Sequence, residues 1–245
     1  MWIYLTGSDV LPPIILYEYA QRRTGKYARD FREGFMGLFQ CDGYQGYNKV
    51  ADVILVFCRA HCRRKFYEAI PEGRRKSLKL LDINSETRIN DPVIPDEAEQ
   101  EKIIPAEIGL CYCNKLFYIE RTLKGLPADE RKAKREELET PVWNGFWKWI
   151  DTIRPLGGSK LQKAVNYALN HHETLCNYMK DGRCEISNNT PEPEQKAMPL
   201  AVRHFYFTHP LLGQMLPWSD FMKEHCAGLI DVENITAEKH EPLPV

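Results

Sequence analysis

Short apolar runs, separated by polar or helical segments, are the feature that most constrains the first seventy residues. They predict four strands, at 2–5, 13–19, 37–41 and 53–58. Inside the second run, Ile14–Tyr17 is continuously apolar, which is typical of a strand buried on both faces. A helical pattern, His61–Ile70, follows the fourth run. This alternation of strands with helices predicts an α/β fold.

The middle of the chain changes to helical spacing. Residues 105–182 carry apolar side chains three and four positions apart, which predicts helices throughout. One helix is expected to stop at Gly125, and a short charged helix, Ala128–Glu139, to end before Pro141. Further apolar faces are predicted at Val142–Ile153 and Leu161–Met179. The acidic, proline-containing residues 83–104 predict a linker, and residues 227–245 a disordered tail.

Charge is segregated along the chain, although the formal net charge is only −1. Residues 59–79 hold eight Lys and Arg against two Glu, whereas residues 82–107 hold eight acids against two bases. The basic stretch is suited to phosphate groups. No apolar run reaches the length of a membrane-spanning helix, so no membrane partner is expected. Eight scattered cysteines in 245 residues favour a reducing, cytoplasmic location.

An acidic residue and a basic cluster follow the last two predicted strands. Asp42 comes directly after the apolar run 36–41, and His61 with Arg63, Arg64 and Lys65 follows the next strand. A carboxylate at a strand end beside cations is what phosphodiester chemistry needs, because one group holds metal and the other phosphate. The structural alternatives are an Asp-Gly turn at Asp42 and a solvated basic helix face.

The Cys58-x-x-His61 spacing has two further interpretations. It could begin a zinc site that Cys62, Cys111 or Cys113 completes, although no second pair has a suitable spacing. It could also be a buried cysteine beside a histidine with a structural role in the helix.

Three segments together resemble a known family. Cys41–Asn48, Cys58–Phe66 and Asp181–Asn189 are similar to motifs of the bacterial transposases of the insertion-sequence 66 family, which belong to the DDE class. The resemblance covers residues 1–226. It implies an RNase-H-like mixed sheet interrupted by an all-helical insertion. The parts would be a core at 1–82, the acidic linker at 83–104, the insertion at 105–182, and a shortened glutamate-bearing part of the core at 183–226, followed by the tail.

The resemblance also assigns site residues. Asp42 matches the second catalytic carboxylate and Glu192 the third, and these would hold Mg²⁺ or Mn²⁺. The family's Cys-x-x-His motif implies that His61 lies near the scissile DNA. The DNA contacts would come from Arg63, Arg64, Lys65 and Arg203. The implied partners are transposon ends, target DNA and further transposase chains.

The chain departs from the family at two of its three carboxylates. Pro191-Glu192-Pro193 stands where the family has Ala-Glu-Arg, and the prolines weaken the helix that should aim Glu192 inward. The first catalytic Asp, in an Asp-Glu-Thr strand that would precede Met1, has no counterpart. We therefore expect an N-terminally truncated, partly degenerate transposase fragment that does not catalyse DNA cleavage and strand transfer, and that holds a divalent ion weakly or not at all.

Loss of that central strand would also leave an unpaired edge in the sheet. Two alternatives to a catalytic fragment stay open at this point. The chain could be a non-catalytic DNA-binding or regulatory transposase fragment, or an inert relic.

Overall fold

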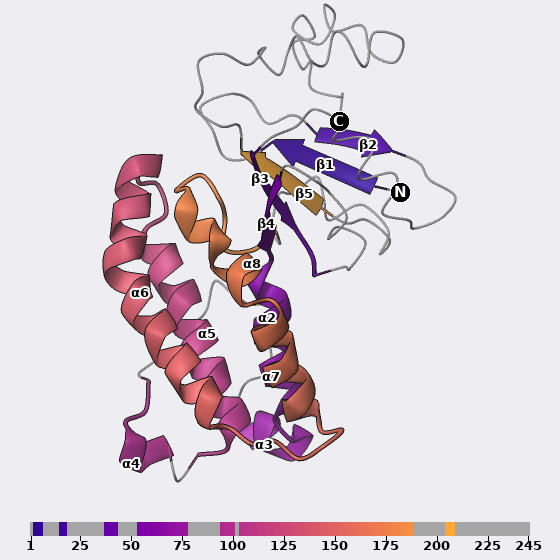
Figure 1. The fold of residues 1–245 in the computed structure, drawn as a ribbon, viewed down its shortest axis with the longest axis vertical. Coiled ribbons are helices and arrows are strands. Elements are labelled where there is room, and N and C mark those ends of the chain that lie inside the picture. Colours follow the sequence, from indigo (N-terminus) through magenta and orange to yellow (C-terminus); the bar gives the residue numbers. More distant parts are fainter. Residues whose placement is uncertain are drawn as a thin grey trace, which may run out of the picture. The chain divides into compact units, whose positions relative to one another are not determined.

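The computed structural model describes residues 2–6, 15–18, 37–43, 53–77, 94–100, 103–188 and 204–208. The chain divides into two units, Met1–His209 and Pro210–Val245, and every described residue lies in the first. The expected tail at 227–245 therefore lies outside the described residues. In the first unit, strands and helices combine as the sequence predicts (Figure 1).

The strands form one five-stranded mixed sheet in the order β2-β1-β5-β3-β4. β1 is antiparallel to β2, and β3 is parallel to β4, with Phe39 opposite Leu55. The bounds are β1 (Trp2–Thr6), β2 (Ile15–Glu18), β3 (Gly37–Cys41), β4 (Val53–Phe57) and β5 (His204–Thr208). The α/β prediction and the four predicted strands are confirmed, with ends that differ by one or two residues.

The central strand, β5, was not predicted. It runs parallel to β1 and antiparallel to β3, with Phe207 opposite both Thr6 and Phe39. The run His204–Thr208 is rich in aromatic residues, which favour strands. Among the described strands, β5 alone joins the β1–β2 pair to the β3–β4 pair. A segment from far along the chain thus completes the centre of the sheet, and β2 and β4 are its edges among the described strands.

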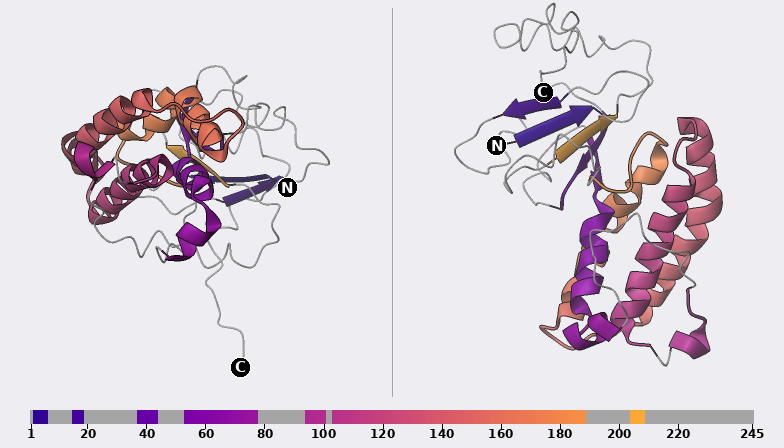
Figure 2. Two further views of the ribbon diagram at one scale, coloured as in Figure 1. Left: turned by 90° about the horizontal axis from the view of Figure 1, so that it is seen from below. Right: turned by 180° about the vertical axis from the view of Figure 1, so that it is seen from behind.

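Helices make up most of the remaining described residues. α5 and α6 lie side by side in all three views, and α2 packs against both α5 and α7 (Figures 1 and 2). α8 and η3 contact β4. The bounds are α2 (Arg59–Ala69), α3 (Glu72–Ser77), α4 (Glu97–Gln100), α5 (Pro105–Thr122), α6 (Ala128–Thr152), α7 (Lys160–Asn170), α8 (His172–Cys176) and η3 (Asn177–Lys180).

Aromatic rings fill the space between α2, α5 and α6. The Phe66 ring lies 5.9 Å from that of Phe146 and 6.0 Å from that of Trp149, and Tyr112 lies 5.7 Å from Phe146. Gly109 on α5 faces Phe66 so closely that a Cβ there would overlap its ring. This glycine therefore sets the close approach of α5 to α2, the helix that carries the predicted basic cluster.

Three helical predictions need correction. The predicted break at Pro141 is wrong, because α6 continues through it as one helix. Buried residues on both sides of the proline, from Arg135 to Ile150, hold the helix together. The third apolar face is divided at His171 into α7, α8 and η3. The linker at 83–104 contains the short helix α4 where it is described.

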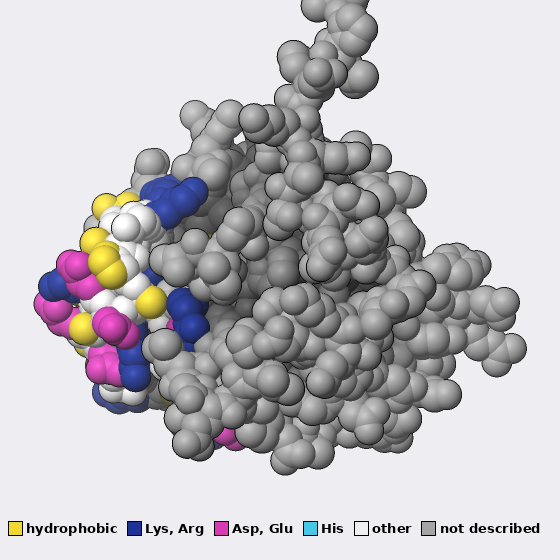
Figure 3. Space-filling view, turned by 90° about the horizontal axis from the view of Figure 1, so that it is seen from above, with side chains coloured by type: hydrophobic (Ala, Val, Ile, Leu, Met, Phe, Trp, Pro, Cys, Tyr) yellow, Lys and Arg dark blue, Asp and Glu magenta, His cyan; other side chains and the backbone are white. Residues whose placement is uncertain are grey.

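Charges of both signs mix on the described surface. Lys76 pairs with Glu72 at 2.9 Å and Lys134 with Glu137 at 2.8 Å, and such exposed pairs contribute little to stability because solvent screens them. Figure 3 shows Lys and Arg side chains among Asp and Glu side chains on one face. Arg74 from the basic stretch is bound to Glu107 by a bidentate pair at 2.5 and 2.9 Å. The basic stretch is therefore partly neutralised within the fold.

Candidate functional site

Asp42 lies where the sequence predicts, directly after β3. It is only 7% exposed. The neighbouring parallel strand β4 ends at the same edge of the sheet, since the Cys58 amide donates a hydrogen bond of 2.9 Å to the Cys41 carbonyl. α2 begins at the next residue, Arg59. The sheet thus brings the buried residue Asp42, at the end of β3, to the same edge at which the basic helix α2 begins.

A distant segment, Cys184–Asn188, returns to this edge. The Arg59 amide donates to the Ile186 carbonyl at 3.1 Å, and Gln40 Nε2 donates to the Glu185 carbonyl at 2.7 Å. Ser187 and Asn188 are both buried, and Ser187 Oγ lies 3.7 Å from Cys58 Sγ. Residues 184–188 therefore run along the ends of β3 and β4. Glu192 and Arg203, which the sequence assigns to the site, lie outside the described residues.

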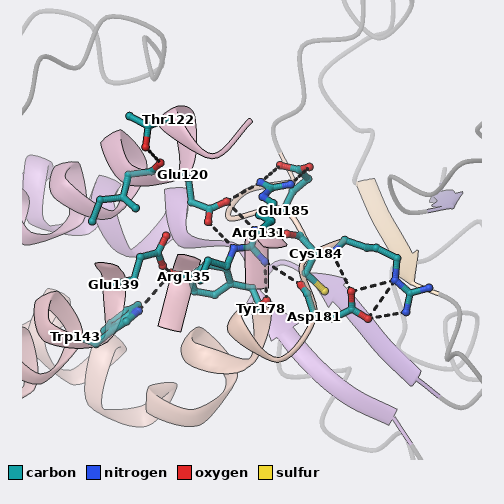
Figure 4. A network of polar contacts seen from close by, with 12 residues as sticks. Glu120, Thr122, Arg131, Arg135, Glu139, Trp143, Tyr178, Asp181, Cys184 and Glu185 are labelled. Atoms are coloured by element: carbon teal, nitrogen blue, oxygen red, sulfur yellow. Dashed lines mark hydrogen bonds and ion pairs between the residues drawn. The ribbon is translucent and has the colours of Figure 1, made fainter. Parts of the chain in front are cut away.

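Arg135 on α6 holds the turn that leads into this segment. Its guanidinium, 0% exposed, donates to the carbonyls of Tyr178, Asp181 and Cys184 at 3.0, 2.9 and 2.6 Å (Figure 4). It also donates to both oxygens of Glu120 on α5, at 2.5 and 2.7 Å. The Arg135 side chain therefore holds the backbone of residues 178–184 against α5 and α6 through three of its carbonyl groups.

Arg131 extends the cluster to Glu185. It donates to Glu120 at 2.6 Å and to both Glu185 oxygens at 3.0 Å. Burial opposes ionisation of Glu120, but hydrogen bonds and charge from Arg135 hold its pKa below the ordinary value. Burial, and then the charge of Glu120, raise the pKa of Glu139 well above its usual range, which favours its protonated form. The buried charges of the two arginines are thus balanced by Glu120 and Glu185.

His61 lies in the first turns of α2. Burial, followed by the charges of Arg64 and Lys65, lowers its pKa from 6.5 to about 4. Its Nδ1 is buried and has no hydrogen-bond partner among the described residues. At neutral pH the ring is therefore an uncharged imidazole, which offers one donor and one acceptor.

The three predicted cations of α2 differ in placement. Arg63 is 6% exposed, and its Nε donates to Asn114 on α5 at 2.7 Å. Arg64 and Lys65 are half-buried, and Lys65 Nζ lies 4.8 Å from the centre of the Tyr167 ring on α7. Arg63 thus faces α5, whereas Lys65 faces α7.

The sequence analysis missed two buried arginines of structural importance, Arg59 and Arg135. The Arg59 guanidinium lies 3.6 Å above the Trp143 ring and donates to the Leu175 carbonyl. Arg59 and Arg63 are four residues apart and so share a helix face with Phe66, a spacing that could have indicated that both point inward. Arg135 carried no such signal, because its partners are 15 to 49 residues away.

The sequence model of the transposase IS66 family matches residues 1–214. This chain belongs to the IS66 transposase family. Membership connects it with DNA transposition and with DNA as the partner of the family. No helix among the described residues is long and apolar enough to cross a membrane.

Relatives are found in Sinorhizobium fredii. The uncharacterized protein y4hP is 28% identical over 224 residues, which cover 84% of this chain and 37% of that protein. The uncharacterized protein y4jD is 25% identical over 214 residues, which cover 82% of this chain and 36% of that protein. The IS66 chain therefore spans little more than a third of the length of these relatives. No solved structure matches it.

A metal site cannot be built from the described residues of this IS66 chain alone. No group of three or more His, Cys, Asp and Glu side chains in that part could hold an ion. The zinc alternative at Cys58 and His61 finds no further ligands there, and the described cysteines are free thiols. A divalent ion at Asp42 would need ligands from beyond the described ranges.

Proposed function

We propose that this chain is part of an RNase-H-like catalytic domain of an IS66 transposase, with Asp42 and Glu192 as its metal-holding carboxylates. The proposal rests mainly on the path of residues 184–188, which pass along the ends of β3 and β4, next to Asp42. Glu192 follows Asn188 by four residues, a reach of at most about 14 Å even in extended chain. The family match over residues 1–214 includes both carboxylates.

The proposed cofactor is Mg²⁺ or Mn²⁺. In this chemistry the bound ion activates the attacking oxygen and stabilises the leaving oxygen of the phosphodiester. Hard cations need several oxygen ligands, so two carboxylates hold such an ion only weakly. This chain's own contribution is to fix Asp42 at the strand end and to exclude water from it by burial.

The proposed DNA contacts are Arg64 and Lys65, with Arg203 as a third. Both α2 side chains are half-buried and lie on the helix that begins beside Asp42. We give Arg63 a structural role, because α5 already holds its guanidinium. His61, neutral at pH 7, would offer a hydrogen bond near the DNA rather than a charge.

We further propose that the chain by itself neither cleaves nor joins DNA. Pro191 and Pro193 flank Glu192, and prolines weaken the helix that is expected to aim this carboxylate inward. The test is incubation of the purified chain with transposon-end DNA and Mg²⁺ or Mn²⁺. The expected result is intact DNA. Strand transfer that disappears in an Asp42→Ala variant would overturn the proposed inactivity and establish catalysis.

A non-catalytic DNA-binding fragment is the second candidate, and the basic stretch of α2 and α3 favours it. Such a fragment would bind DNA with a steep salt dependence and could assemble with full-length transposase. Fluorescence anisotropy at increasing salt measures the first property, and co-purification with a full-length relative the second. Absence of both would leave an inert relic.

A further inference from the structure

The segment around α7 carries positive charge that no acidic residue within it offsets. Residues 152–172, which include all of α7, contain Arg154, Lys160 and Lys163 but no Asp or Glu. Lys160 and Lys163 are exposed on α7. Neither of them forms a salt bridge with another described residue. The surface of α7 therefore presents cations to solvent without compensating carboxylates of its own.

Several cations on other described helices have acidic partners instead. Lys134 on α6 pairs with Glu137 at 2.8 Å, and Lys76 on α3 pairs with Glu72 at 2.9 Å. Each pair offsets a positive charge with a negative one, so these surfaces carry both signs. The surface of α7 differs from them because its lysines keep their full charge for a ligand.

α2 adds a third cation to the same side of α7. Lys160, Lys163 and Tyr167 are three and four residues apart, so their side chains leave α7 within about 60° of one another. Lys65 Nζ on α2 lies 4.8 Å from the centre of the Tyr167 ring, and α2 packs against α7 (Figure 1). Lys65, Lys160 and Lys163 thus form a line of ammonium groups across two helices, here called the lysine stripe.

The length of the lysine stripe suits a nucleic-acid backbone. From Lys160 to the ring of Tyr167, where Lys65 lies, α7 rises about 10 Å, or about two helical turns. Duplex DNA carries about one phosphate charge per 1.7 Å of its axis, so a stretch of this length presents about six charges. Lysine binds phosphate as a point charge and reads no bases. Since DNA is the partner of the family, the stripe fits a DNA backbone better than an acidic protein.

One end of the lysine stripe lies against the segment that follows Asp42. A Cβ built on Gly43, the residue directly after Asp42, would be only 2.7 Å from Tyr167 Oη. The contact joins α7 to the chain at the end of β3. A duplex that binds along the stripe would therefore extend from the helical insertion toward the part of the core that carries the proposed carboxylates.

We propose that Lys160 and Lys163 of α7 form, with Lys65 of α2, a surface that binds the phosphate backbone of duplex DNA. The inference rests on the proposed function, which takes DNA as the ligand and Lys65 as one of its contacts. It adds two contacts from the helical insertion, outside those that the family resemblance implies. The insertion then holds DNA through its backbone, without selecting a base sequence.

The test compares two double variants that remove the same charge. Lys160→Gln with Lys163→Gln removes the α7 cations of the stripe, and Lys132→Gln with Lys134→Gln removes two exposed cations of α6. Binding of a labelled mixed-sequence duplex is measured by fluorescence anisotropy across a salt series. The α7 variant should reduce the salt slope by about two and weaken binding about tenfold or more at about 0.1 M salt. The α6 variant should keep the wild-type slope.

Two further variants separate charge from structure. Lys160→Arg with Lys163→Arg keeps both charges, so it should keep the wild-type salt slope. Lys65→Gln should reduce the slope by about one. Without DNA, both α7 variants should unfold at the wild-type temperature, because the substituted side chains are exposed.

A wild-type salt slope in the Lys160→Gln, Lys163→Gln variant would overturn this inference, while a reduced slope in Lys65→Gln would leave the proposed function intact. An equal reduction in the α6 variant would also overturn it, since net charge alone would then be responsible. The same holds for a reduced slope in the arginine variant.

Unlabelled polyglutamate that displaces the labelled duplex better than unlabelled duplex does would assign the lysine stripe to an acidic protein and so overturn the inference. If the wild-type chain binds no duplex even at low salt, the DNA-binding part of the proposed function fails, and this inference fails with it.

Discussion

The buried cluster around Arg135 contains two glutamates in different states. Glu120 faces both arginines, and Arg135 holds its pKa below the ordinary value, whereas Glu139 accepts a hydrogen bond from the Tyr178 hydroxyl and its pKa is raised well above the usual range by burial. Buried arginines need a full charge opposite them, but a carboxyl that carries its proton can be replaced by an amide. The same chemical change should therefore act differently at the two positions.

Glu120→Gln should lower the free energy of unfolding by about 3 to 5 kcal/mol, because Arg131 and Arg135 lose their shared charge. Glu139→Gln should not lower it. The pKa of Glu139 is raised above 4.5, so the wild type loses stability as the pH rises from 4.5 through the folded-state pKa, and the amide removes that loss. Urea unfolding at pH 5 and pH 8 checks both variants. A destabilised Glu139→Gln at pH 8 would show that this carboxyl is ionised.

His61 should make stability depend on pH in a different window. Its folded-state pKa, about 4, lies below the unfolded value of 6.5, so the unfolded chain takes up the proton first as the pH falls. Stability is therefore lost between pH 6.5 and 4. From pH 7 to pH 5 the wild type should lose about 1 to 2 kcal/mol more than His61→Gln. Parallel losses in urea titrations would contradict a buried, neutral His61.

At the scale of elements, four of the five described strands could be predicted, whereas β5 and several helix boundaries could not. The apolar runs before Asp42 and Cys58 predicted β3 and β4 closely, because buried parallel strands have few other sequence patterns. The helix end predicted before Pro141 was wrong, because a proline inside a helix removes one hydrogen bond but does not prevent the helix from continuing. In α6, burial of Arg135 and Glu139 before the proline and of Trp143 and Phe146 after it outweighs that loss.

Pro141→Ala should consequently stabilise the protein. The side chain is exposed, and alanine restores the amide that can donate to the carbonyl four residues earlier. We expect the free energy of unfolding to rise by about 1 to 2 kcal/mol. Thermal unfolding measures this change. Ala133→Gly on the same helix is the control, because it should lower the unfolding temperature. A lower unfolding temperature for Pro141→Ala would mean that the proline ring itself stabilises α6.

β5 should be needed for the whole sheet. Tyr206 is paired with Leu5 on one side and Gln40 on the other. A proline there removes an amide from a central strand, so Tyr206→Pro should lower the free energy of unfolding by about 3 kcal/mol or more. Hydrogen exchange of the β1 and β3 amides should accelerate together. Unchanged protection in both strands would show that β5 is dispensable.

At the scale of the whole molecule, the sequence predicted the position of Asp42 in the fold but not the segments that pack around it. Asp42 was expected at a strand end and lies there, buried. The close approach of residues 184–188 and the insertion of Tyr167 beside Gly43 could not be predicted, because each depends on contacts between segments more than a hundred residues apart. The sequence also did not predict the burial of Arg63. Its guanidinium was expected to face DNA or solvent, but it donates to Asn114 in the α2–α5 interface.

The central claim is that Asp42 and Glu192 serve one site, and Mn²⁺ binding tests it most directly. Electron paramagnetic resonance titrations of the wild type, Asp42→Asn, Glu192→Gln and the double variant measure how much Mn²⁺ each binds. The account predicts weak binding to the wild type, loss of it in either single variant and no further loss in the double variant. Undiminished Mn²⁺ binding after either substitution, or losses that add as for independent sites, would contradict it.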